Sequence, residues 1–178
     1  MRAAIDLFAE QGYDSTTVAQ IAERAGLTKT TFFRHFPDKR EVLFAGQEQH
    51  SRLFADGIAA APDSATPLEA VVAALDTVTA SFTSEQRDFG PRLRAVIDAN
   101  SELRERAVFK HASLVTAMTE ALRKRGVPDP AAGLAADLGI RAFDRAWDRW
   151  TEPSSQQTFT ELAREELRAL RAAAMTLD

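Results

Sequence analysis

Apolar residues recur three and four positions apart along nearly the whole chain. This period places the apolar side chains of a segment on one face of an α-helix. No segment alternates between apolar and polar residues for long enough to favour a strand. The sequence therefore predicts an all-α protein with about nine helices.

The first forty residues predict three short helices. The first spans residues 2–11 and ends at Gly12, because glycine readily adopts the left-handed conformation that closes a helix. Thr17 and Gln20 have the spacing of a capping box, which opens the second helix. Gly26 ends that helix, and the next helix follows within a few residues.

The third helix begins after Thr28, a good N-cap, and is expected to pack against the second through Leu27 and Phe32. Two short helices joined by a sharp turn at a glycine are typical of a helix-turn-helix. Pro37 ends the third helix, and a long fourth helix is expected from there to about Ala60.

Five further helices are predicted over residues 68–82, 86–99, 102–125, 131–150 and about 159–177. Segments rich in proline, glycine and serine separate several of them. The last helix has an apolar stripe that needs a partner, and the helix before it has small residues that allow a close approach.

We place the domain boundary inside the fourth helix. Residues 1–45 then form a helix-turn-helix domain, and residues 46–178 form a second helical domain.

The composition excludes several classes of chemistry. Hydrophobic residues at 45% and charged residues at 27% are ordinary for a globular protein, and no apolar run is long enough to span a membrane. We therefore expect a cytoplasmic protein without a membrane partner. The absence of cysteine excludes disulfides, thiolate metal sites and cysteine nucleophiles, and three scattered histidines predict neither a metal site nor another cofactor.

The net charge of −4 hides a basic segment. Between residues 29 and 40, Lys29, Arg34, Lys39 and Arg40 oppose one carboxylate, Asp38. Hydroxyl and cationic side chains on a recognition helix are the groups that contact base edges and phosphates in a major groove. The pattern indicates DNA binding, although a solvated basic face is the simpler alternative.

Three segments carry a family resemblance: FAEQGY at 8–13, TVAQIAERAGL at 17–27 and TFFRHFPDK at 31–39. Over about residues 3–45 they resemble the TetR/AcrR family of regulators. The resemblance implies a homodimer that inserts the third helix of each subunit into a palindromic operator. It also implies a basic arm before the first helix, of which this sequence holds only Arg2.

The same resemblance implies two groups of DNA contacts. Phe33 stands where the family often has tyrosine, so packing or stacking on the backbone replaces a hydroxyl contact. The implied base contacts are Thr28, Lys29, Thr30 and Arg34, and the implied phosphate contacts are Thr17, Thr31, Phe33, His35 and Lys39.

For residues 46–178 the family plan implies a helical ligand-binding and dimerisation domain, with a ligand pocket and a four-helix dimer interface made by the last two helices. Residues 92–106 and 142–150 also resemble regulators that bind acyl-CoA-like ligands. Simple core packing is the alternative for each aromatic or apolar pocket candidate. These candidates are Phe82, Phe89, Phe109, Met118, Phe143 and Trp147.

A cluster of basic residues in the same region has two interpretations. It could hold a phosphate or carboxylate of a ligand, or it could be a solvated helix face, since acidic residues lie among its members. Its members are Arg92, Arg94, Arg104, Arg106 and Lys110. Asp144 and Asp148 are interpreted as surface charge rather than a catalytic pair.

The sequence therefore predicts a ligand-responsive transcriptional regulator and not an enzyme. Its expected partners are a double-stranded DNA operator, a second copy of the chain and a small, mostly apolar effector, for which an acyl-CoA-like compound is one option. Repression is the leading hypothesis and activation stays open. The alternative is an all-α small-molecule binding protein or enzyme that keeps the helix-turn-helix shape without binding an operator.

Overall fold

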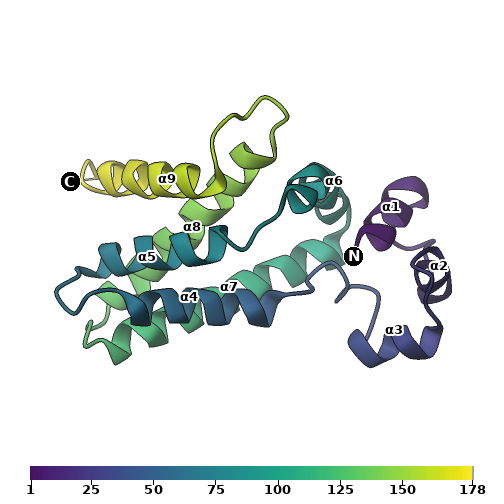
Figure 1. Ribbon diagram of the computed structural model, residues 1–178, viewed down its shortest axis with the longest axis horizontal. Coiled ribbons are helices and arrows are strands. Elements are labelled where there is room, and N and C mark those ends of the chain that lie inside the picture. Colours follow the sequence, from purple (N-terminus) through teal and green to yellow (C-terminus); the bar gives the residue numbers. More distant parts are fainter. Residues whose placement is uncertain (178) are drawn as a thin grey trace. The chain divides into compact units, whose positions relative to one another are not determined.

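The computed structural model describes residues 1–177. Within them the chain forms nine α-helices and no strand, which confirms the predicted fold class (Figure 1). The helices are α1 (Arg2–Gln11), α2 (Val18–Arg24), α3 (Lys29–His35), α4 (Gln47–Ala60), α5 (Pro67–Thr79), α6 (Ser84–Ala99), α7 (Ser101–Lys124), α8 (Ala131–Thr151) and α9 (Phe159–Ala174).

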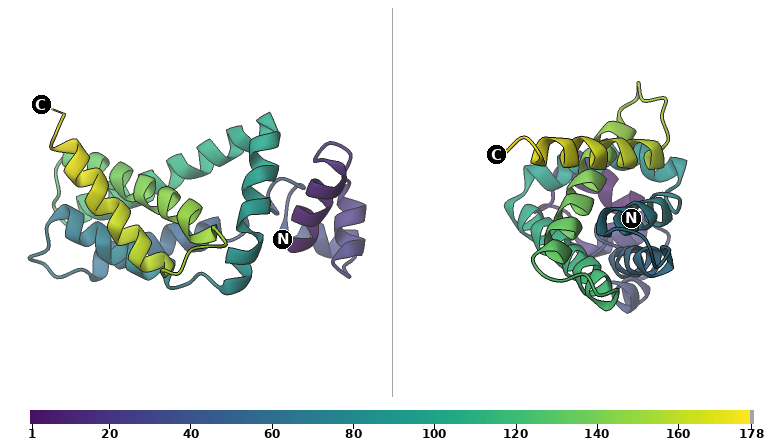
Figure 2. Two further views of the ribbon diagram at one scale, coloured as in Figure 1. Left: turned by 90° about the horizontal axis from the view of Figure 1, so that it is seen from above. Right: turned by 90° about the vertical axis from the view of Figure 1, so that its left-hand side faces the viewer.

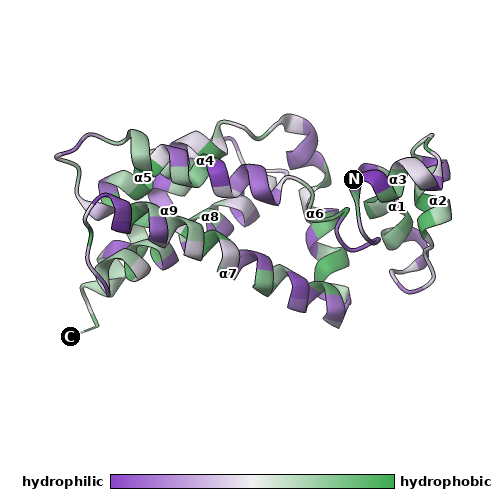
Figure 3. Ribbon diagram, turned by 90° about the horizontal axis from the view of Figure 1, so that it is seen from below, coloured by the Kyte–Doolittle hydropathy of each residue, from purple (hydrophilic) through white to green (hydrophobic). Residues whose placement is uncertain are grey.

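The chain divides into two compact units. The first contains residues 1–47 and 88–110, and the second contains residues 48–87 and the chain from residue 111 onward. The sequence placed residues 88–110 with the C-terminal helices, but they group with the helix-turn-helix. The helices of both units carry hydrophilic and hydrophobic residues interspersed along their length (Figure 3), as expected for amphipathic helices.

The first unit has its own hydrophobic core. Ile5 of α1, Ile21 of α2 and Phe32 of α3 are almost fully buried there. Val96 of α6 and Leu103 of α7 belong to the same cluster. Residues 88–110 join this unit because they complete a core that three short helices cannot close by themselves.

The predicted start of the long fourth helix is wrong. The Asp38 carboxylate accepts the backbone N–H groups of Arg40 and Glu41 at 2.8 and 3.1 Å, so it caps a turn and not the start of a regular helix. The turns that follow are closed by i to i+3 hydrogen bonds, and Gly46 at φ 90° interrupts them. The regular helix α4 therefore begins only at Gln47.

The second unit is built around α5, α8 and α9. Helices α8 and α9 lie side by side, and α5 packs against both (Figures 1 and 2). Leu75, Met118, Leu122 and Leu162 are fully or almost fully buried in its core. No helix in residues 1–177 combines the length and the apolar character that a membrane span requires.

Candidate nucleic-acid interface

The second helix of the motif opens with the predicted capping box. The Thr17 hydroxyl accepts the backbone N–H of Gln20 at 3.3 Å, and the Gln20 side chain accepts the backbone N–H of Thr17 at 2.8 Å. Each residue satisfies a donor that the first turn of a helix leaves free. The start of α2 is therefore fixed by its local sequence.

The turn between α2 and α3 is equally well defined. Gly26 has a φ of 67°, and its backbone N–H donates to the Glu23 carbonyl at 3.0 Å. The N–H of Leu27 donates to the Ala22 carbonyl at 2.8 Å, which completes a Schellman closure. The Thr28 hydroxyl then accepts the backbone N–H of Thr31 at 3.1 Å and starts α3.

Helix α3 is anchored by one side. Phe32 is 2% exposed, and its ring centroid lies 5.4 Å from that of Phe36. Leu27 is 43% exposed, so of the two residues expected to pack α3 against α2 only Phe32 is buried. The rest of α3 thus has a face directed away from the core, and its exposed residues are Lys29, Thr30, Phe33, Arg34 and His35.

The charges on this face are available for a ligand. Within residues 1–177, Lys29 and Arg34 form no ion pair. Arg40 differs, because its guanidinium contacts the carboxylates of Asp38 and Glu102 at 2.8 Å each. The side-chain hydrogen bond from Arg40 holds the pKa of Asp38 below its usual value. Of the basic segment, Lys29 and Arg34 therefore carry the uncompensated charge on α3.

Lys39 also serves the fold of this unit. Its ammonium donates to the backbone carbonyls of Tyr13 and Thr16 at 2.7 and 3.0 Å, and lies 4.1 Å from the centroid of the Tyr13 ring. Burial raises the pKa of Tyr13 to about 12. These contacts tie the segment after α3 to the loop before α2, and nothing in the sequence spacing indicated them.

The six predicted pocket residues do not gather in one place. Phe82, Phe143 and Trp147 form an aromatic cluster in the second unit, with the Phe82 ring centroid 5.7 Å from Phe143 and 5.4 Å from Trp147. Met118 lies fully buried in the core of that unit. Phe89 is buried in the core of the first unit, and Phe109, also of the first unit, is 59% exposed.

The basic cluster of α6 and α7 is largely committed to carboxylates of its own unit. Arg92 contacts Asp6 at 2.6 Å, and Arg106 and Lys110 contact Glu41 at 2.6 and 3.0 Å. Burial alone would raise the pKa of Glu41, but hydrogen bonds from these two cations outweigh it and lower that pKa. The arrangement favours internal ion pairing over a grip on a ligand phosphate.

Comparison with known proteins points to one family. Residues 1–45 match the model of bacterial regulatory proteins of the tetR family. The transcriptional regulator TcmR of Streptomyces glaucescens is 38% identical over 78 residues, which are 44% of this chain and 34% of that protein. The regulator HbdR of an Aromatoleum species is 45% identical over 42 residues, 24% of this chain and 18% of that protein.

Solved structures agree in fold over nearly the whole chain. GusR of Salmonella enterica has a TM-score of 0.59 at 20% identity, covering 95% of this chain and 91% of that one. The fatty acid degradation regulator FadR of Bacillus halodurans has a TM-score of 0.55 at 22% identity, covering 95% and 90%.

The two kinds of similarity have different reach. The matched segments span about a third or less of the length of the curated relatives just described, and those relatives are transcriptional regulators. The family match is confined to residues 1–45, whereas the chain as a whole has the fold seen in TetR-family structures.

Proposed function

We propose that this chain, whose residues 1–45 match the tetR-family model, is a cytoplasmic, ligand-responsive transcriptional repressor. The observation that carries the proposal is the exposed, uncompensated face of α3. Lys29 and Arg34 stand on a short helix that a capping residue, a glycine turn and the buried Phe32 hold in one orientation. A rigid helix with free cations and hydroxyls is what major-groove recognition requires.

The proposed contacts include this face and residues beside it. Base contacts fall to Thr28, Lys29, Thr30 and Arg34, and phosphate contacts to Thr17, Thr31, Phe33, His35 and Lys39. Two of the three N–H donors of Lys39 are used inside the unit, which leaves one for a phosphate oxygen.

A single copy of α3 reads only one half-site. We propose a homodimer that uses α8 and α9 as its interface and binds a palindrome whose half-sites lie about one helical turn, roughly 34–36 Å, apart. An effector that prefers a conformation with wrongly spaced recognition helices would lower the affinity for the operator. The effect cannot exceed its differential affinity for the two conformations.

The test starts from selection of binding sites from random DNA with the full chain. The selected site is then titrated against scrambled DNA at two salt concentrations, because phosphate contacts alone give salt-dependent but sequence-blind binding. A palindrome bound at least about a thousandfold more tightly than scrambled DNA supports the proposal. Equal, weak binding to every sequence contradicts it and favours a binding protein or enzyme that keeps only the helix-turn-helix shape.

The double variant Lys29→Ala/Arg34→Ala locates the interface. Loss of two contacts should weaken binding to the selected site by about thirtyfold or more and should reduce the salt dependence. The matched control is Arg52→Ala on α4, whose side chain is 75% exposed and, among residues 1–177, pairs only with Glu48 of the same helix. Equal affinities of the double variant and the control would mean that α3 does not read DNA.

A further inference from the structure

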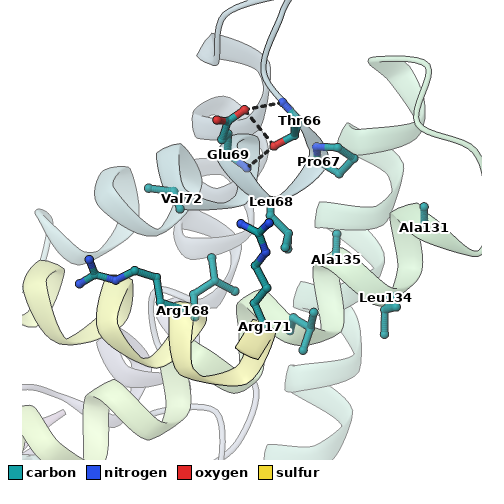
Figure 4. A pocket seen from close by; sticks show the side chains of 12 residues that line it. Thr66, Pro67, Leu68, Glu69, Val72, Ala131, Leu134, Ala135, Arg168 and Arg171 are labelled. Carbon is teal, nitrogen blue, oxygen red and sulfur yellow. Dashed lines mark hydrogen bonds between the residues drawn. The ribbon is translucent and has the colours of Figure 1, made fainter. Parts of the chain in front are cut away.

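A pocket of about 480 Å³ lies in the second unit, where the first turns of α5 and α8 meet the last turns of α9 (Figure 4). Its volume falls within the range of about 300–1,000 Å³ that is usual for small-molecule sites. None of the pocket residues predicted from the sequence lines it. Its apolar lining includes Leu68 and Val72 of α5, Leu134, Ala135 and Leu138 of α8, and Leu167 of α9.

Two arginines of α9 line the same pocket. Figure 4 shows the side chain of Arg171 extending from α9 toward Leu68 of α5, while Arg168 extends away from Arg171. Neither guanidinium group forms a hydrogen bond or an ion pair within the described part of the chain. Arg164, one turn before Arg168 on α9, instead donates from Nε and Nη2 to the two carboxylate oxygens of Asp76 at 2.6 Å each.

The one carboxylate in the lining does not neutralise these arginines by direct contact. One oxygen of Glu69 accepts the backbone N–H and the hydroxyl of Thr66 at 2.7 and 2.9 Å in the capping box of α5. These two hydrogen bonds lower the pKa of Glu69, and the charge of Arg171 adds to the effect from a distance. The N-terminal ends of α5 and α8 contribute further positive potential to the pocket.

We propose that this pocket binds an amphiphilic anion. The apolar chain of the ligand packs against Leu68, Leu134 and Leu138, and its carboxylate or phosphate head pairs with Arg171, with Arg168 at the rim. An apolar lining with cations beside it favours an anion over a neutral hydrocarbon, because only the anion pairs with the two exposed arginines. The identification of this ligand as the effector rests on the proposed function, whereas the binding itself does not.

The test is calorimetric titration of the full chain with decanoate, decyl phosphate and the neutral decanol below their aggregation concentrations. The two anions distinguish a carboxylate from a phosphate head. We expect at least one anion to bind at least about tenfold more tightly than decanol, since hydrogen bonds to charged groups are the stronger ones. Binding of decanol as tight as that of both anions, or no binding at all, overturns the proposal.

Variants separate the pocket from a general surface effect. Arg168→Met/Arg171→Met keeps much of the apolar stems and removes both charges, and it should weaken anion binding by about tenfold or more. Arg52→Met on α4, whose side chain is 75% exposed and lies outside this pocket and outside the proposed α8–α9 interface, is the matched control and should bind like the parent chain. Equal loss in both variants, or no loss in either, overturns the proposal.

Leu134→Glu provides a second readout, because Leu134 is 61% exposed and a carboxylate there repels the anion without disturbing the core. Light scattering of each variant is measured alongside. If Leu134→Glu and Arg168→Met/Arg171→Met break up a dimer and abolish anion binding only through that change, the groove is an interface between copies and the proposal fails. If the parent chain binds the anion but shows no selective DNA binding, the proposed function is refuted and the proposed anion site is not.

Discussion

Two helices of the second unit approach each other closely at Gly57 of α4. A Cβ atom at this position would lie 2.5 Å from the Cα of Ala74, 2.9 Å from the carbonyl oxygen of Ala73 and 2.9 Å from the hydroxyl of Thr77. Two of these three atoms are backbone atoms of α5, which cannot move without shifting the helix. Gly57→Ala therefore forces α4 and α5 apart.

The size of the effect follows from two opposing terms. Alanine in place of glycine inside a helix stabilises it by about 1 kcal/mol. Overpacking a filled interior costs about 1–3 kcal/mol, and the backbone contacts at Gly57 place the cost at the upper end. We expect a net loss of about 2 kcal/mol in the free energy of unfolding, which corresponds to a fall of roughly 4–8 °C in Tm for a chain of this size.

Gly133 of α8 is the matched control. A Cβ atom there meets nothing within 4 Å, so Gly133→Ala should gain up to about 1 kcal/mol from helix propensity. Both variants are measured by urea and thermal unfolding, followed by circular dichroism. A Gly57→Ala variant as stable as the parent chain, or equal shifts in both variants, would refute the argument that this glycine is required by helix contact.

Three other predictions concern the first unit. Thr28→Ala removes the cap of α3 and should cost about 1 kcal/mol in urea unfolding, and Thr28→Ser should restore most of it; equal stability of all three chains would contradict the capping role. Tyr13 is the sole tyrosine, so near-ultraviolet titration of the folded chain should give a midpoint near pH 12. A raised folded pKa means that its contribution to stability is complete below pH 10 and declines above it, and a midpoint near 10 would show that Tyr13 is solvated. The lowered pKa of Glu41 has the opposite sign, so the stability it gains from Arg106 and Lys110 is present above its unfolded pKa and is lost as the pH falls through the folded value. Glu41→Gln should be less stable than the parent chain at pH 7, with a difference that shrinks in acid; a constant difference from pH 7 to 3 would rule out the ion pairs as its cause.

Local signals predicted the helix-turn-helix almost residue by residue. The caps at Thr17 and Thr28 and the turn at Gly26 depend on side chains and backbone within a few positions of one another, so spacing alone is enough to recognise them. The predicted start of the fourth helix was wrong because the apolar period does not distinguish a helix from a series of turns. Its apolar period continued through residues 38–46, and the turns that replace the helix there do not change that period.

Contacts between distant residues were beyond the reach of the sequence. The period of α6 and α7 predicted helices correctly, but it could not indicate that residues 88–110 pack with the helix-turn-helix. The sequence left open whether the basic cluster binds a ligand, because the carboxylate partners of Arg92, Arg106 and Lys110 are distant in the chain; Glu41, for example, lies 65 positions from Arg106. An ion pair between two helices does not change the spacing of apolar and polar residues along either helix.

The sequence by itself determined that this protein is all-helical and that a capped, basic helix follows a glycine turn near its N-terminus. Both properties are set by hydrogen bonds and side-chain period over one or two helical turns. Only the tertiary structure decided which charges remain uncompensated: Lys29 and Arg34 on α3, and Arg168 and Arg171 beside the pocket of α5, α8 and α9. Compensation depends on distance in space, and packing brings together residues that the sequence keeps far apart.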